Sequence, residues 1–222
     1  IGSVYSMKED YKTALKYYKK AEELNKTDVQ VKYNLATAYV NLKNYDKAKK
    51  IFIEVTELFP KFVPAYNNLA FLFIKLNLIE KAIDTYKKIL SINPSEPFIN
   101  FNLALAYLKM NDIESAYDFI FEEFKNNKNN ADTTSLFVKI LGDKHNNEPY
   151  KMIIELEKIS KIYASTFIDT ALGLLYYKIN DTVKSEKYFK DALQKDPTNA
   201  VALNNIGYLY FNKQMFDIAE EC

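Results

Sequence analysis

Four asparagines recur at a regular interval, and their side chains carry chemistry that packing alone does not require. Asn34, Asn68 and Asn102 are evenly spaced, and Asn205 follows after three more such intervals and one extra residue. An amide side chain donates two hydrogen bonds and also accepts, so it can pair with a peptide N–H and a peptide C=O at once. Set in one row, such amides would hold an extended backbone regardless of its sequence.

Apolar residues accompany this asparagine row at two neighbouring positions of the same interval. We expect them to share its face and to form pockets for ligand side chains, because peptide grooves combine apolar area with a few placed polar groups. The candidate peptide-binding residues are therefore the four asparagines together with Tyr33, Phe71, Phe101, Leu105, Leu174 and Tyr208.

The elements that position the row come from an internal repeat. Pro60 and Pro94 are separated by the same interval as the asparagines, and this shift also aligns leucine, alanine and aromatic positions. The chain has only four glycines and six prolines, which favours helices joined by short turns. The aligned sets are Leu35, Leu69 and Leu103; Ala36, Ala70 and Ala104; Tyr39, Phe73 and Tyr107; and Ala48, Ala82 and Ala116.

This pattern resembles the tetratricopeptide repeat, a helix–turn–helix unit of about 34 residues with small and aromatic positions and a closing proline. The resemblance covers essentially the whole chain. It implies an all-α, right-handed superhelical α-solenoid of antiparallel helix pairs, since one hairpin cannot bury its apolar side alone. The first-helix tryptophan of the family is absent, and its position holds Lys32, Tyr66, Asn100, Asp169 and Leu203.

The predicted domain is a single solenoid over residues 1–222, truncated at both ends. Its units are 1–28 (partial), 29–62, 63–96, 97–130, 131–165 (degenerate), 166–199 and 200–222 (partial).

In the degenerate unit, Asp132 or Thr133 is expected to cap a helix that Gly142 ends. An enlarged loop over 143–148 then precedes Pro149, which suits the first turn of the next helix. The unit is either a drifted repeat or a hinge or partner site.

In such arrays the sixth position of the first helix lines the concave surface. The asparagine row there resembles the ladder in the repeat region of O-GlcNAc transferase and related bacterial arrays, which implies peptide binding. Ala171 and Leu136 interrupt it, so the first three asparagines form its best stretch. The alternative is structural: each asparagine bonds only to neighbouring helices.

Composition argues against several other functions. The net charge is +1 and all 30 basic residues are lysine, and without arginine specific nucleic-acid recognition is disfavoured. The longest apolar run, 171–177, is too short to span a bilayer. The lone Cys222 permits no internal disulfide, and the lone His145 is expected to be a surface residue. No catalytic residue, metal site or cofactor is predicted.

Lysine is also missing from the positions that clamp a terminal carboxylate in some arrays, so that ligand is not expected. We predict a non-enzymatic scaffold that binds a protein or an extended peptide in its concave groove. The alternatives are the substrate-recognition arm of a larger enzyme, such as a protein glycosyltransferase, and an assembly platform stacked through its ends. No targeting segment is visible, which leaves the cytoplasm as the default compartment.

Overall fold

The computed structural model describes residues 1–221, so Cys222, including its place in the last predicted unit, lies outside the described residues. Fourteen helices and no strands occur in this part of the chain, which confirms the all-α class. The chain forms two compact units, residues 1–110 and 111–222, and each is described by itself.

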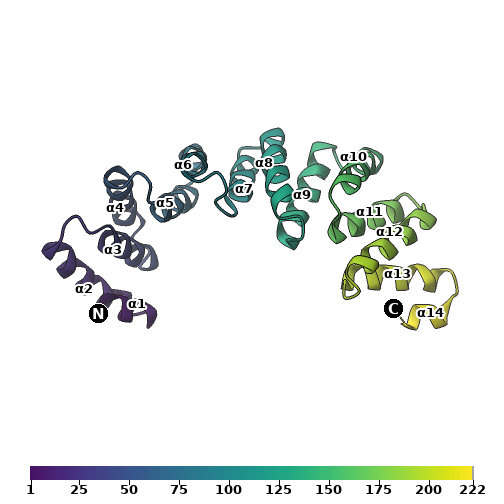
Figure 1. Cartoon of the computed structure of the whole chain (residues 1–222), viewed down its shortest axis with the longest axis horizontal. Coiled ribbons are helices and arrows are strands. Elements are labelled where there is room, and N and C mark those ends of the chain that lie inside the picture. Colours follow the sequence, from purple (N-terminus) through teal and green to yellow (C-terminus); the bar gives the residue numbers. More distant parts are fainter. Residues whose placement is uncertain (222) are drawn as a thin grey trace. The chain divides into compact units, whose positions relative to one another are not determined.

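Unit 1 holds seven helices, which are drawn from purple to teal in Figure 1. First and second helices of the repeats alternate along the chain, and α3 packs on α4 as α5 does on α6, while α2, α4 and α6 each also pack on the next first helix. The helices are α1 (Gly2–Met7), α2 (Tyr11–Leu24), α3 (Val29–Asn41), α4 (Tyr45–Leu58), α5 (Val63–Lys75), α6 (Ile79–Ile92) and α7 (Ile99–Lys109).

Unit 2 holds the other seven helices. Here α11 pairs with α12 and α13 with α14, whereas α9 packs on α8 and touches α11. The helices are α8 (Ile113–Asn126), α9 (Ala131–Lys144), α10 (Pro149–Ile162), α11 (Thr166–Lys178), α12 (Thr182–Lys195), α13 (Ala200–Asn212) and α14 (Phe216–Glu221). A membrane-spanning helix is absent from the described residues.

The turn between the two helices of each pair repeats as regularly as the helices. Each turn contains a residue with a positive φ that is not glycine, and the turn of the degenerate unit has a second one, Asn147. An Asp or Asn directly after the positive-φ residue caps four of the second helices, α2, α4, α8 and α12. The spacing of these turns is constant except for one extra residue at the degenerate unit, which therefore keeps the two-helix rhythm. The residues are Glu9, Lys43, Asn77, Asn111, Asn146, Asn180 and Gln214.

Close helix packing relies on small residues at one repeat position. A Cβ added to Gly173 would lie 2.6 Å from the ring of Phe189, and one added to Gly2 would lie 2.7 Å from the ring of Tyr18. Each glycine belongs to a first helix and each ring to the second helix of its pair. These pairs show why a small residue recurs where an aromatic side chain of the partner helix must lie flat.

The predicted start and the predicted end of the first helix in the degenerate unit are both wrong. Asn130, rather than Asp132 or Thr133, caps α9, since its side chain accepts a hydrogen bond from the Thr133 N–H at 2.8 Å. Gly142 does not end α9, which continues to Lys144. The connecting loop covers only residues 145–148, so it is shorter than the predicted 143–148.

The helix continues through Gly142 because this glycine is buried and has no positive φ. A Cβ at this position would lie 2.8 Å from the side-chain oxygen of Asn147, so glycine serves a close contact there. Asn146 and Asn147, with φ of 53° and 56°, turn the chain instead. Pro149 begins α10, as predicted.

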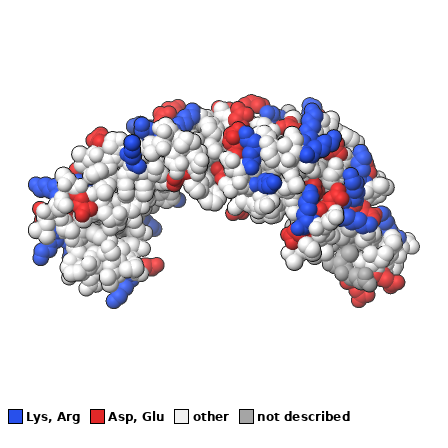
Figure 2. All heavy atoms as spheres, in the orientation of Figure 1, with Lys and Arg blue, Asp and Glu red and all other residues white. Residues whose placement is uncertain are grey.

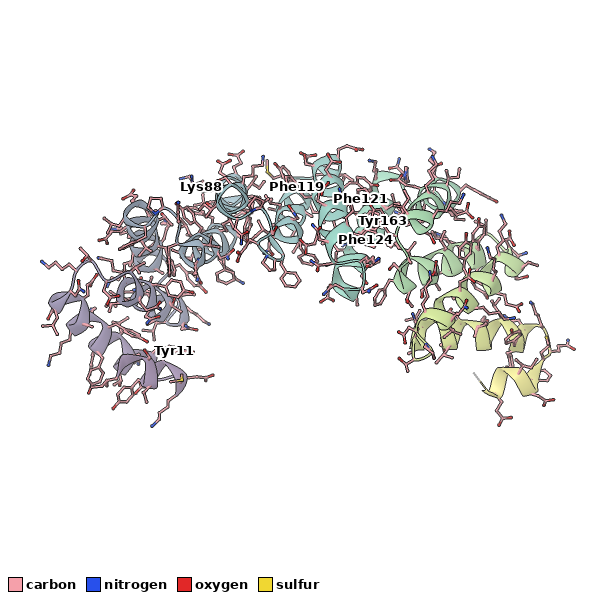
Figure 3. The ribbon with its side chains drawn as sticks, in the orientation of Figure 1. Tyr11, Lys88, Phe119, Phe121, Phe124 and Tyr163 are labelled. Carbon is pink, nitrogen blue, oxygen red and sulfur yellow. The ribbon has the colours of Figure 1, made fainter. Side chains whose placement is uncertain are left out.

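An aromatic cluster holds the degenerate unit to α8. Phe124 of α8 stacks on Phe137 of α9 with ring centroids 5.0 Å apart. Tyr163, which follows α10, meets Phe121 and Phe124 edge-on at 6.2 and 5.9 Å (Figure 3). The helices therefore pack closely even where the sequence pattern of the repeat is lost.

Candidate functional site

One side of the first helices in unit 1 remains open to solvent. Residues at i, i+4, i+7 and i+11 share a side of an α-helix, and at these repeat positions α3, α5 and α7 show only half-buried or exposed residues, as does Phe98 directly before α7. We call this set the open face. It comprises Gln30, Asn34, Thr37 and Asn41; Pro64, Asn68, Phe71 and Lys75; and Phe98, Asn102, Leu105 and Lys109.

The open face therefore brings together three of the predicted asparagines with two of the predicted apolar residues. Phe71 is 42% exposed and Leu105 is 38% exposed, so both present apolar area to solvent. Phe101 is half-buried beside Asn102.

Asn68 is tied to the neighbouring repeat. Its Nδ2 donates to the hydroxyl of Tyr33 on α3 at 3.0 Å and to the carbonyl of Pro64 at 3.1 Å. The Tyr33 ring is fixed in turn by Phe62 and Phe52, at 5.4 and 5.9 Å. The Nδ2 of Asn68 therefore bonds within the protein, as the structural alternative expects. Its Oδ1 has no hydrogen bond within the described residues.

Asn34 and Asn102 keep more of their amide chemistry available. The Oδ1 of Asn34 accepts from Gln30 at 3.0 Å, which leaves its Nδ2 unbonded by the described residues. The side chain of Asn102 makes no hydrogen bond in this part of the chain, so its donors and its acceptor are all open. A cavity of about 450 Å³ borders Asn34 and is lined also by Tyr17 and Leu24 of α2.

The remaining predicted residues belong to unit 2. Asn205 is half-buried and its Nδ2 donates to the carbonyl of Val201 at 2.7 Å. Leu174 and Tyr208 are 40% and 53% exposed, and Tyr208 meets Tyr177 edge-on at 6.2 Å. Tyr208 also lines a cavity of about 690 Å³ between α13 and α14. Unit 2 accordingly presents an aromatic surface with one amide rather than an amide row.

Charge is distributed unevenly between the helices of unit 1. Only three charged residues occur in α3, α5 and α7, and all are lysines: Lys32, Lys75 and Lys109. Lys32 is buried, so the open face carries two cations and no carboxylate. In the view of Figure 2, uncharged residues cover most of unit 1, and charged side chains are scattered among them.

A polar role for the position where the family has tryptophan was not predicted. Lys32 is 5% exposed and bonds Glu22 of α2 at 3.1 Å and Glu54 of α4 at 2.7 Å. Burial alone would lower the pKa of Lys32, but the hydrogen bonds to both carboxylates raise it above its ordinary value. The sequence did show a charged residue, Lys32, at a position that the family fills with tryptophan. That position varies commonly in the family, so the charge was not recognised as a buried ion pair.

Unit 2 repeats this arrangement with the charges exchanged. Asp169 is 2% exposed, accepts from the Ser160 hydroxyl at 3.1 Å and pairs with Lys195 of α12. Each buried charge thus bridges the preceding second helix and the second helix of its own pair.

His145 lies at the surface but is half-buried and not free. Its Nε2 is 2.6 Å from Glu155 Oε2, and the Tyr117 hydroxyl donates to the other oxygen of the same carboxylate. Burial would raise the pKa of Glu155, but these two hydrogen bonds bring it below the usual value. Among the described residues no group of three His, Cys, Asp or Glu side chains could hold a metal ion.

Comparison with known proteins agrees with this fold. Models described as tetratricopeptide repeat match residues 7–72, 63–96 and 188–221. No curated protein sequence matches the chain.

Several solved structures are similar. One is YrrB, described as a TPR protein with an unusual peptide-binding site, with a TM-score of 0.55 at 17% identity, covering 84% of this chain and 95% of YrrB. A tetratricopeptide repeat protein from Parabacteroides merdae gives 0.62 at 15% identity, with 98% and 86% covered. Pseudomonas aeruginosa pilF gives 0.61 at 14% identity, with 90% and 91% covered. At such identities the likeness concerns the fold alone.

Proposed function

The chain belongs to the tetratricopeptide repeat family, and on this premise we propose that it is a protein-interaction scaffold whose unit 1 binds an extended peptide along the open face. The observation that carries the proposal is the unbonded side-chain amide of Asn102 on the open face. Its half-buried side chain has no hydrogen-bond partner within the described residues and lies on the face that also holds exposed Leu105 and Phe71. An amide placed among apolar side chains is suited to pair with a backbone.

The three asparagines offer different parts of that chemistry. Asn34 has donors available, Asn68 has its acceptor, and Asn102 has both. A peptide backbone presents N–H and C=O groups in alternation, so it can satisfy all three without regard to its side chains. The neighbouring apolar residues would then select the side chains that lie beside the backbone.

We also propose that binding occurs without catalysis. The tetratricopeptide fold is in general a non-catalytic scaffold, and the side chains of the open face are amides, apolar groups, a threonine and two lysines at helix ends. YrrB, a relative in fold, is described as having a peptide-binding site, which supports a peptide as the ligand class.

The test compares three variants for binding to a set of fluorescent extended peptides, measured by anisotropy. We expect the combined N34A, N68A and N102A variant to bind at least tenfold more weakly, since each lost hydrogen bond costs about 0.5–1.5 kcal/mol. The single N102A variant isolates binding, because this side chain makes no intramolecular hydrogen bond among the described residues. Replacement of the exposed Asn126 and Asn129 of unit 2 serves as the control.

Circular dichroism and thermal melting separate the two interpretations of the row. If helicity and melting temperature fall together in N102A while binding per folded molecule stays unchanged, the row is structural and the proposal is wrong.

A further inference from the structure

The open face is ordered in bands that cross its helices. On α5 an apolar residue comes first, then an asparagine, then a second apolar residue, and last a lysine, and α7 has the same order when the exposed residue directly before it is included. The members are Pro64, Asn68, Phe71 and Lys75, and Phe98, Asn102, Leu105 and Lys109. A backbone laid along the asparagine band would direct alternate side chains toward opposite bands, because successive residues of an extended chain point to opposite sides.

The last band, at the helix ends, is cationic on α5 and α7, whereas α3 has Asn41 there. Lys75 and Lys109 are exposed, neither has an ion pair within the described residues, and α3, α5 and α7 contain no Asp or Glu. The carboxylates of unit 1 lie on the second helices and in the turns. Lys75 Nζ is held 5.3 Å from the ring centroid of Phe71, which places a positive charge directly beside an exposed apolar contact.

The first band contains an aromatic residue in a costly conformation. Phe98 caps α7 with φ of 61° and is 49% exposed. A bulky residue rarely adopts this φ, and it presents its ring to solvent at the start of the face rather than in the core. The α5 and α7 part of the open face therefore combines apolar area on both sides of its amides with cations along one edge.

We infer that the ligand of the open face is an extended peptide segment that carries both bulky apolar and acidic side chains. The inference rests on the proposed function and adds the side-chain chemistry to it. Apolar side chains contact Phe71, Phe98 and Leu105, and carboxylates lie against Lys75 and Lys109. A lysine-rich segment of the same apolar content is repelled from this edge.

Three short, terminally blocked fluorescent peptides of equal length test this inference. They share one apolar frame and differ only in the intervening residues, which are acidic, serine or lysine. We expect the acidic peptide to bind roughly threefold to tenfold more tightly than the serine peptide, with the lysine peptide weakest, since two exposed ion pairs contribute modestly. The preference should shrink as salt is raised toward about 1 M.

Charge reversal provides the matched control. The K75E and K109E double variant should invert the order, so that the lysine peptide binds best. The K50E and K88E double variant changes the same number of charges on α4 and α6, which are second helices (Lys88 in Figure 3), and should keep the original order.

The outcomes separate this inference from the proposal beneath it. If the acidic and serine peptides bind equally and N102A weakens both, peptide binding stands and the acidic preference is wrong. If none of the peptides binds, or if N102A leaves all binding unchanged, both are wrong.

Discussion

One repeat position carries a buried lysine in unit 1 and a buried aspartate in unit 2. Lys32 lies between Glu22 and Glu54, and Asp169 lies between Ser160 and Lys195. In each case the first helix is joined to the second helices on both sides of it. What the packing requires at this position is contact with two helices, and a charge of either sign provides it when its partners match.

The comparison also shows how neighbouring repeats can be kept in order. A lysine at this position needs carboxylates from both second helices, whereas an aspartate needs donors. If the second helices of one unit packed around the first helix of the other, the buried charge would have no partner of opposite sign. The cost of that unpaired charge disfavours such mispacking.

The largest expected effect comes from exchanging the two charges. Lys32→Asp places a third carboxylate between Glu22 and Glu54, and Asp169→Lys places a second ammonium beside Lys195. Each should lower the free energy of unfolding by about 3–5 kcal/mol, measured by urea denaturation, because a buried charge loses its partner and meets its like.

Alanine at the same positions sharpens the comparison. Lys32→Ala and Asp169→Ala should each cost about 2–3 kcal/mol, less than the exchange, since the partners Glu54 and Lys195 are 48% and 37% exposed and regain water. Equal losses for alanine and for the exchanged charge would show that the volume of the side chain, and not its charge, holds the helices.

Acid should lower the stability of unit 2 through protonation of the Glu186 carboxylate. Hydrogen bonds from Lys190 and Lys213 lower the pKa of Glu186 to about 2, from an ordinary value of 4.5. A folded-state pKa below the unfolded one adds stability above pH 4.5 that is lost as the pH falls toward 2. Denaturation at a series of pH values should show a shallower acid loss in Glu186→Gln than in the parent chain.

A smaller effect is expected at the link between Tyr33 and Asn68. Tyr33→Phe removes the acceptor of one Asn68 N–H, so the free energy of unfolding should fall by about 1 kcal/mol. The same change frees an amide donor for a ligand on the open face. Tyr208→Phe in unit 2 is the control, because no hydrogen bond of its hydroxyl occurs within the described residues.

The smallest predicted effect concerns the turns. Lys43 and Gln214 have φ of 59° and 61°, a conformation that costs residues other than glycine about 1–2 kcal/mol. Glycine at either position should raise stability by up to about 1 kcal/mol in thermal melting, because glycine pays no steric cost at positive φ. Asn77→Gly should gain less, since asparagine tolerates this conformation better.

Most of the fold was predictable because the repeat pattern reports local packing. Small and aromatic residues that recur once per repeat specify where helices approach, and the start of α10 was predicted from the preference of proline for the first helical turn. The role of Gly142 was not predictable. Gly142 makes room for the side chain of Asn147 instead of ending the helix. The position of Asn147 depends on the turn that follows α9, which the sequence pattern does not specify.

The candidate site was predictable only in outline. Helical periodicity predicts that Asn34, Asn68 and Asn102 share one face of their helices, and each of the three is half-buried at its position. It does not tell which amide groups are already bonded, because the bond from Asn68 to Tyr33 joins residues of two repeats. The ion pairs of Lys32 and Asp169 were missed for the same reason: their partners lie one helix before and one helix after.

The unpaired amide of Asn102 has a consequence for how a ligand would leave. Such a group is hydrated while the face is empty, so each ligand contact replaces water and the net gain per hydrogen bond is about 1 kcal/mol. No single contact then dominates the complex. A bound segment would detach progressively, a residue or two at a time, and shortening it would weaken its hold by degrees.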